Sequence, residues 1–276
     1  MAKQFSLFDG KDRFKTNKPI RLIELFAGVG SQAMALKAIG ANFETHRICE
    51  FDKFAVQSYN AIHGTSFVPS DITKTTATDL AVADTDKYCY IMTYSFPCQD
   101  LSQAGKGAGT RSGLLWEVER LLTEMQELPQ VLVMENVPQV LKAEGFAEWL
   151  AVLEKLGYKN AVQVLDAKDY GVPQNRKRAF MISLLGDFSY EFPKAKPLAK
   201  RLRDMLEHEP VDPKYYLVQK QVEQVANSTF TQERTRIVDG GAVCRTLCAR
   251  DFKSLTCVRL SGSVDEVRSI KPIHGT

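Results

Sequence analysis

The feature that most constrains the fold is a short apolar strand that ends in a glycine turn and leads into a helix. Residues 21–26 (RLIELF) are predicted to form a buried strand, and the apolar spacing of residues 31–40 predicts a helix that closes on a glycine. Gly28 and Gly30 lie between them, where glycines allow a tight turn and let backbone amides approach a ligand. The third glycine of a dinucleotide fingerprint and the lysine of a P-loop are missing, so neither of those sites is predicted.

Strands and helices continue to alternate through the first two thirds of the chain. Further strands are predicted at residues 46–50, 88–94, 131–135 and 178–184, and further helices at 54–62, 113–127 and 146–156. Strands separated by helices predict an α/β protein with a doubly wound, mostly parallel sheet. The regularity fades after residue 188, so we expect two domains, residues 1–190 and 191–276.

Composition and charge narrow the class of protein. No apolar run approaches the roughly 20 residues of a membrane span, and the N-terminus lacks the apolar stretch of a signal peptide. The six cysteines are irregularly spaced, which predicts reduced thiols in a cytoplasmic protein. Residues 191–276 carry 15 Lys and Arg against 11 Asp and Glu, whereas residues 1–190 carry 21 against 22. This local excess suits contact with an anionic polymer, although a solvated face would have the same composition.

Acidic residues are predicted to follow two strands near the glycine turn. Glu50 ends the strand at 46–50, a usual position for an acid that accepts hydrogen bonds from a ribose. Phe51 beside it is suited to stacking on an adenine, and Asp71 with Ile72 is expected to end a further strand. A two-glycine turn by itself is more often a turn without a ligand than part of a binding site. Together with two acids at strand ends, it favours a site for a nucleoside cofactor.

Reactive and charged residues follow three of the predicted strands. Cys98 lies in SFPCQDLS, just beyond the strand at 88–94, where α/β enzymes place reacting groups. An isolated cysteine there is more often a small buried side chain. Glu135 ends the strand at 131–135, and Arg176 and Arg178 lie in QNRKR. A surface carboxylate and a basic strand edge are the alternatives for these three.

Taken in order, FAGVGS, CEFD, SDIT, SFPCQDLS, RSGLLWEVER, MENV and QNRKR resemble the successive motifs of the cytosine-C5 DNA methyltransferases over about residues 20–184. The resemblance implies the Rossmann-like fold of class I S-adenosylmethionine-dependent methyltransferases. It also implies S-adenosylmethionine as methyl donor, S-adenosylhomocysteine as product, a cytosine flipped out of double-stranded DNA as substrate, and a role in restriction-modification or on a mobile element. A tRNA cytosine methyltransferase and an inactive fragment that binds DNA or a partner are the alternatives.

The resemblance further implies a role for each motif residue. Cys98 would add as a thiolate to cytosine C6, which makes C5 nucleophilic. Glu135 would carry a proton to N3, for which its site should raise its pKa. Arg178 would approach O2 of the base while Arg176 steadies the site. The donor site is assigned to Phe26, Gly28, Gly30, Glu50, Phe51, Asp71, Ile72, Pro97 and Leu114, and the flipped base to Phe96, Pro97, Gln99 and Ser102.

The C-terminal part departs from the family pattern. Members carry a variable target-recognition region, then an Arg-x-Leu-Thr-like motif, and then a Gly-Asn-x-Val segment that completes the donor pocket. CRTLCARD at residues 244–251 matches the second of these in part, and no Gly-Asn-x-Val occurs in the sequence. We therefore expect a partial recognition region and either a second subunit that supplies the last segment or a truncated product. Cys244, Cys248 and Cys257 have no histidine nearby, so no metal site is predicted.

Overall fold

The computed structural model describes residues 12–97 and 113–206, together with short segments at 218, 220, 223, 237–239, 241–245, 256–259 and 267–270. These residues form two compact units. The first comprises Met1–Leu165 and Arg178–Pro193, and the second comprises Asp166–Lys177 and Lys194–Thr276. The second unit thus includes residues 166–177 as well as the part that follows Pro193, and the two expected domains, 1–190 and 191–276, remain a prediction.

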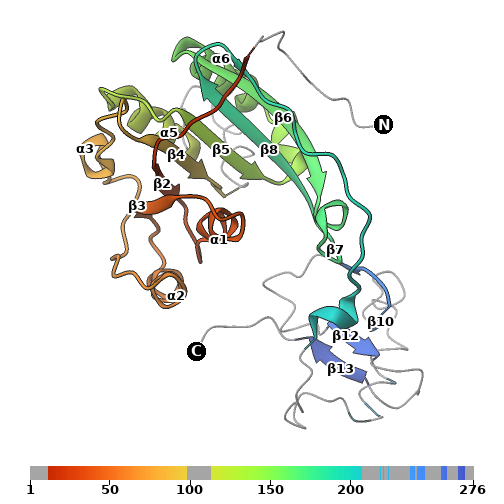
Figure 1. The fold of residues 1–276 in the computed structure, drawn as a ribbon. Coiled ribbons are helices and arrows are strands. Elements are labelled where there is room, and N and C mark those ends of the chain that lie inside the picture. The colour runs from red at the N-terminus through yellow and green to blue at the C-terminus, as the bar shows by residue number, and fades with distance from the viewer. Residues whose placement is uncertain are drawn as a thin grey trace. The chain divides into compact units, whose positions relative to one another are not determined.

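The first unit is built on a six-stranded sheet with the order β3-β2-β4-β5-β8-β6 (Figure 1). Its strands are β2 (Ile20–Leu25), β3 (Phe43–Cys49), β4 (Cys89–Tyr94), β5 (Val131–Asn136), β6 (Tyr158–Asp166) and β8 (Lys177–Leu185). The pairs β2–β3, β2–β4 and β4–β5 are parallel, whereas β8 runs antiparallel to β5. The sheet is therefore mixed and mostly parallel, which confirms the predicted fold class.

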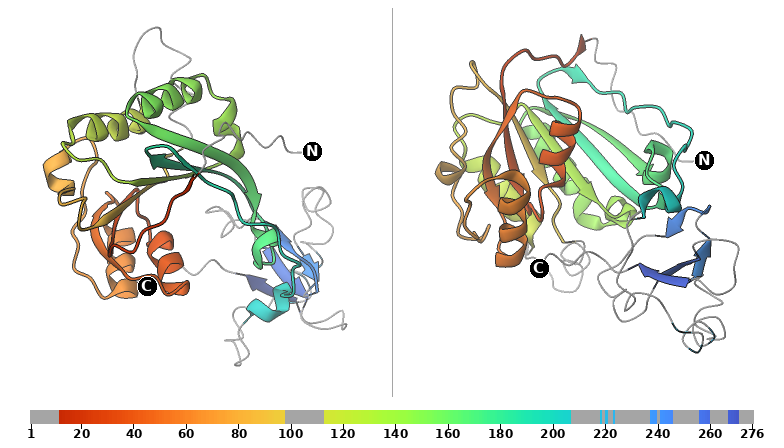
Figure 2. Two further views of the ribbon diagram at one scale, coloured as in Figure 1. Left: turned by 45° about the horizontal axis from the view of Figure 1, so that its top comes forward. Right: turned by 60° about the horizontal axis from the view of Figure 1, so that its bottom comes forward.

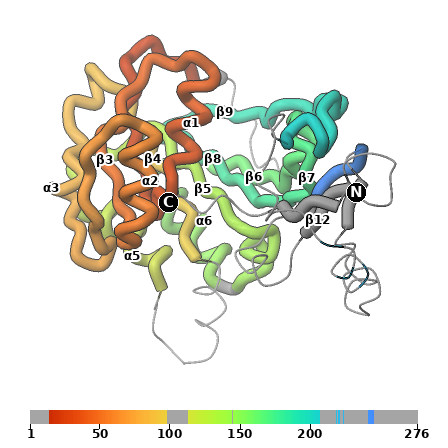
Figure 3. The backbone as a smooth tube through the Cα atoms, turned by 90° about the horizontal axis from the view of Figure 1, so that it is seen from below, coloured from red at the N-terminus to blue at the C-terminus, as the bar shows by residue number. Residues whose placement is uncertain are grey.

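Helices cover both faces of this sheet (Figures 1 and 2). They are α1 (Ser31–Ala38), α2 (Lys53–His63), α3 (Ala77–Leu80), α5 (Leu114–Glu124) and α6 (Glu144–Lys155). On one face, buried side chains of α5 and α6 pack against Met92 and Leu132 of the sheet. On the other face α2 packs against β3 through Val56 and Ile48. Figure 3 shows α1, β3 and α2 together in the red-to-orange part of the chain.

The core beneath α5 and α6 contains both tryptophans of the chain. The ring centroids of Trp116 and Trp149 lie 6.5 Å apart in an edge-to-face arrangement. Trp149 is fully buried and its indole N–H donates a hydrogen bond of 3.1 Å to the hydroxyl of Tyr94. Buried indole and phenol groups normally find such a partner, so this bond places the two aromatic side chains in one defined packing arrangement.

Short elements complete the two units. In the first, β1 (Asp12–Arg13) pairs with β9 (Phe188–Ser189), and a 3-10 helix, η2 (Pro138–Lys142), follows β5. The described residues of the second unit form two 3-10 helices, η3 (Ala167–Tyr170) and η4 (Leu202–Met205), and two small sheets. One sheet pairs β7 (Gln174–Asn175) with β11 (Cys244–Arg245), and the other contains β10 (Ile237–Asp239), β12 (Thr256–Arg259) and β13 (Val267–Ile270). None of the helices in the described part of the chain is long and apolar enough to cross a membrane.

The prediction that Asp71 and Ile72 end a strand is wrong. They lie in a turn in which the backbone N–H of Lys74 donates to the carbonyl of Asp71 at 2.9 Å. The Asp71 side chain also accepts from the backbone N–H of Thr73 at 3.0 Å. Aspartate side chains readily capture the backbone two residues ahead, and this local bond replaces the strand pairing that the apolar neighbours suggested.

Candidate active site

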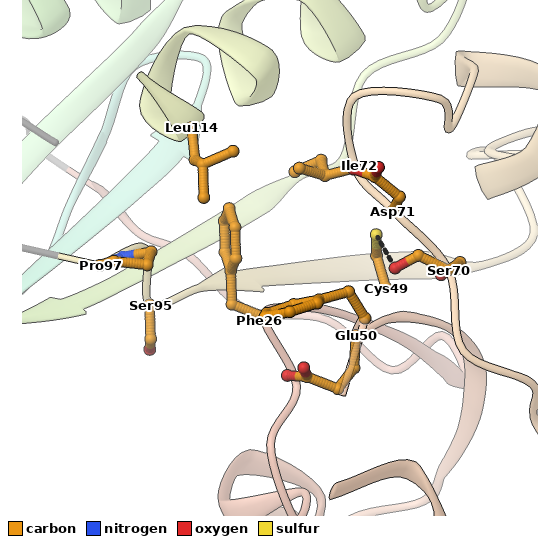
Figure 4. Close-up of a pocket in the computed structure, with 10 residues that line it drawn as sticks. Phe26, Cys49, Glu50, Ser70, Asp71, Ile72, Ser95, Pro97 and Leu114 are labelled. Atoms are coloured by element: carbon orange, nitrogen blue, oxygen red, sulfur yellow. Dashed lines mark hydrogen bonds between the residues drawn. The ribbon is translucent and has the colours of Figure 1, made fainter. Parts of the chain in front are cut away.

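A cavity of about 440 Å³ lies at the carboxyl ends of β2, β3 and β4 (Figure 4). It is lined by Phe26, Cys49, Glu50, Phe51, Ser70, Asp71, Ile72, Ser95, Pro97 and Leu114. Seven of the nine residues assigned to the donor site from the sequence are among them, and the two others are the glycines of the turn. Cys49, Ser70 and Ser95 were not predicted to line the site, although each is the first residue of a quoted motif (CEFD, SDIT and SFPCQDLS).

The topology of the sheet explains why these distant residues meet. Phe26 directly follows β2, Glu50 follows β3, and Ser95 follows β4. Carboxyl ends of neighbouring parallel strands meet at one edge, which is where open α/β sheets bind ligands. In Figure 4 the Phe26 side chain lies between Pro97 on one side and Ile72 on the other. The cavity therefore has apolar walls, with the Glu50 and Asp71 carboxylates among its lining residues.

The turn after β2 is held in left-handed backbone conformations. The φ angles are 57° at Phe26, 54° at Gly28 and 80° at Gly30. A Cβ added to Gly30 would overlap the rings of Tyr59 and His63 on α2, whereas one added to Gly28 would meet nothing within 4 Å. Gly30 therefore permits close packing of α2 against the turn, a structural reason that differs from the expected approach of a ligand.

Glu50 is tied to the backbone on both of its carboxylate oxygens. Oε2 accepts a hydrogen bond from the N–H of Gly28 and Oε1 accepts one from the N–H of Asp52, each at 2.9 Å. Each carboxylate oxygen has a second lone pair, so these bonds leave acceptor capacity toward the cavity. The arrangement orients Glu50 and braces the glycine turn at the same time.

A second acid, Glu24, lies beneath the turn inside the fold. The sequence analysis did not predict a role for it. Its side chain is fully buried, with Oε2 accepting from the hydroxyl of Tyr59 at 2.5 Å and Oε1 from the backbone N–H of Ala33 at 3.3 Å. Burial raises the pKa of Glu24, and the hydrogen bond from Tyr59 opposes that rise in part. A glutamate within an apolar strand was the available signal, because buried charges require partners.

Glu135 and Arg178 meet at the ends of two neighbouring strands. The antiparallel register of β5 and β8 pairs Glu135 with Phe180, which brings the Arg178 side chain to the same edge. Arg178 Nε lies 2.9 Å from Glu135 Oε1, and the two side chains are only 19% and 23% exposed. The ion pair therefore holds the Glu135 carboxyl group and the Arg178 guanidinium side by side at this edge of the sheet.

Asn136 joins the loop after β4 to the end of β5. Its Nδ2 donates to the carbonyl of Phe96 at 2.9 Å, and its Oδ1 accepts from the N–H of Val137 at 2.8 Å. These two bonds give Asn136 a structural role. Phe96 as a whole is only 2% exposed and its ring packs in the core, so it presents almost no surface to a ligand in this structure.

Several predicted site residues stand apart from these contacts. Cys98, Gln99 and Ser102 lie outside the described residues. Arg176 belongs to the second unit, where its backbone N–H donates to Asp166 Oδ1 at 2.9 Å. Within the part of the chain that the structure describes, no group of three or more His, Cys, Asp or Glu side chains could hold a metal ion.

Comparison with known proteins adds three findings. A family model described as C-5 cytosine-specific DNA methylase matches residues 20–266. The Type II methyltransferase M.NlaX of Neisseria lactamica is 37% identical over 207 residues, which cover 72% of this chain and 63% of the relative. The orphan methyltransferase M.SssI of Spiroplasma monobiae is 49% identical over 127 residues, 42% of this chain and 33% of the relative. The chain thus spans less than two thirds of the length of either relative.

A solved structure gives the same fold. The S. pombe Dnmt2 methyltransferase matches with a TM-score of 0.70, covering 89% of this chain and 77% of that chain. The sequence identity is 22%, so this likeness concerns the fold alone.

Proposed function

The chain belongs to the C-5 cytosine-specific DNA methylase family, and from this premise we propose that it transfers a methyl group from S-adenosylmethionine to C5 of a cytosine flipped out of double-stranded DNA. The observation that carries the proposal is the cavity at the ends of β2, β3 and β4. Its volume of about 440 Å³ lies within the range of roughly 300–1,000 Å³ that is usual for cofactor sites.

The residues around the cavity fit the parts of this donor. The remaining lone pairs of Glu50 suit the ribose hydroxyls, and Asp71 Oδ2 suits the amino group of the adenine. Phe51 is 78% exposed at the cavity, and an adenine ring stacked on it would cover that apolar surface. Phe26 and Leu114 provide apolar walls toward the rest of the ligand.

The chemistry at the base requires a nucleophile and a proton donor. When bound, the donor supplies an electrophilic methyl group on its sulfonium. The Cys98 thiolate adds to C6, the C5–C6 double bond opens, and C5 would take the methyl group as its bond to sulfur breaks, with S-adenosylhomocysteine as the leaving group. Loss of the C5 proton to a solvent base and departure of the thiolate then restore the double bond.

Glu135 is proposed to exchange a proton with N3 of the same cytosine. The ion pair with Arg178 engages Oε1, so Oε2 is the oxygen assigned to N3. Glu135 shares a proton with N3 while electrons move into the ring and takes it back when the thiolate leaves. Arg178, which lies beside it, is assigned to O2 of the base, and Arg176 to steadying the site.

A trapping assay tests the proposal. The chain is incubated with S-adenosylmethionine and duplex DNA that carries 5-fluorocytosine, whose C5 fluorine blocks the final elimination. A covalent protein–DNA complex should appear on a denaturing gel and should be lost in Cys98→Ser. Cys89→Ala, which alters a buried cysteine at the other end of β4, should retain it.

Absence of the complex in the wild-type chain would overturn the proposal for this chain alone. A second subunit that carries a Gly-Asn-x-Val segment remains a prediction, tested by repeating the assay with any such polypeptide encoded nearby. A tRNA substrate in parallel tests the alternative acceptor, which no feature of the described residues favours. The cytoplasmic location also remains a prediction, tested by fractionation of the producing cells.

A further inference from the structure

Arg120 of α5 reaches across to the turn at residues 71–75. Its Nη2 donates to the carbonyl oxygens of Ile72 at 3.0 Å and Thr75 at 2.7 Å. Its Nε and Nη1 are held on the other side by Glu117 at 2.8 Å and Glu124 at 3.0 Å. One guanidinium therefore connects the helix that begins at the cavity with the turn that forms part of the cavity wall.

The turn itself is organised around Asp71. The backbone N–H and the hydroxyl of Thr73 both donate to Asp71 Oδ1, at 3.0 and 2.8 Å, while the Thr75 hydroxyl donates to the Asp71 carbonyl at 3.0 Å. These bonds give the turn its internal shape, and the two from Thr73 hold the pKa of the Asp71 carboxyl below its usual value. They do not attach the turn to the rest of the fold, and the bonds from Arg120 to Ile72 and Thr75 provide such an attachment.

We propose that Arg120 is a positioning residue that holds this turn in place, so that Asp71 and Ile72 meet the adenine end of the donor. The inference rests on the proposed function, because it assigns the adenine to this side of the cavity. Arg120 is not among the lining residues of the cavity, so its effect would be transmitted entirely through the turn. It would determine how well the site distinguishes adenine from other purines.

The two carbonyl contacts are the strongest part of the link between Arg120 and the turn. Arg120 and its glutamate partners are about one third exposed, and ion pairs of that kind contribute little. Ile72 and Thr75 are nearly buried, so losing the guanidinium would leave two carbonyls poorly solvated. The planar guanidinium of arginine can donate hydrogen bonds to acceptors on two sides at once. The compact ammonium group of lysine cannot do so in the same geometry.

The test compares two ligands that differ only in the purine. Dissociation constants of S-adenosylhomocysteine and its hypoxanthine analogue, S-inosylhomocysteine, are measured by calorimetry on the full chain. The wild-type chain should prefer the adenine form. Arg120→Lys should weaken S-adenosylhomocysteine about tenfold, roughly the contribution of one hydrogen bond to a charged group, and weaken S-inosylhomocysteine by less than about twofold.

A matched control is Arg21→Lys. Arg21 also bonds two partners, Glu44 at 2.8 Å and Tyr90 at 2.9 Å, but it lies near the start of β2, away from the cavity. It should leave both dissociation constants unchanged. If Arg120→Lys fails to fold, Glu117→Gln, which loosens one anchor of Arg120, should shift the preference in the same direction by a smaller factor.

The outcomes separate this inference from the proposed function. A wild-type chain that binds neither ligand contradicts the proposed function. A wild-type chain that binds both equally shows that the turn does not read the purine, and the inference fails. It also fails if Arg120→Lys weakens both ligands by the same factor, because a general loss of stability would do that.

Discussion

Replacing Gly30 with alanine should destabilise the first unit through two separate costs. The φ angle of Gly30 is +80°, and a left-handed conformation costs an L-residue about 1–2 kcal/mol. The new Cβ would also lie 2.5 Å from Cε2 of Tyr59 and closer still to the His63 ring. Overpacking of this kind typically costs about 1–3 kcal/mol. The predicted loss in the free energy of unfolding is therefore about 2–5 kcal/mol.

Gly28→Ala is the matched control on the same turn. Its φ of +54° imposes the same kind of backbone cost, but nothing lies within 4 Å of the added Cβ. Its N–H still donates to Glu50. The expected loss is about 1–2 kcal/mol, so the difference between the two variants isolates the overlap of Gly30 with Tyr59 and His63.

Urea denaturation followed by far-ultraviolet circular dichroism measures both losses, provided that the m-values agree between the variants. Removing the obstructing ring with His63→Ala in the Gly30→Ala background should recover part of the lost stability. Equal losses in the two alanine variants would refute the reasoning, because they would mean that α2 does not pack against the turn as described.

Three further predictions concern single side chains. Asn160 is buried and neither of its side-chain polar atoms has a hydrogen-bond partner among the residues that the structure describes, so Asn160→Leu should raise the free energy of unfolding by about 1 kcal/mol in urea titrations. Burial raises the folded-state pKa of Glu24 above 4.5, so its contribution to stability falls as pH rises above that value, and Glu24→Gln should flatten the pH dependence of the urea midpoint. Glu135→Gln should slow methyl transfer about 100- to 10,000-fold, measured with labelled donor, and leave S-adenosylhomocysteine binding unchanged.

The central strands could be predicted because a strand buried on both faces consists almost entirely of apolar residues. β2, β4 and β5 are short apolar runs, and each lies within about one residue of its predicted bounds. The edge of the sheet where the cavity lies followed from them, since the ends of neighbouring parallel strands converge, whereas Pro97 and Leu114 were assigned to it only through the family resemblance. The motif order then assigned roles that the apolar pattern alone could not.

Other features depend on contacts between residues far apart in the chain. β6 was not predicted, because its residues from Tyr158 to Asp166 mix polar and apolar side chains at an edge of the sheet, where one flank has no neighbouring strand. The link from Arg120 to Ile72 joins positions 48 residues apart, and no local pattern signals it. The Asp71 turn was missed because side-chain capture of the backbone overrode the strand propensity of its neighbours.

The placement of Trp116 and Trp149 has a consequence for spectroscopy. They are the only tryptophans in the sequence, and both belong to the core beneath α5 and α6 of the first unit. Intrinsic fluorescence excited at the indole band therefore reports on that unit, while the second unit contributes no indole signal. Unfolding curves that differ between fluorescence and circular dichroism would reveal the two units melting separately, without any engineered label.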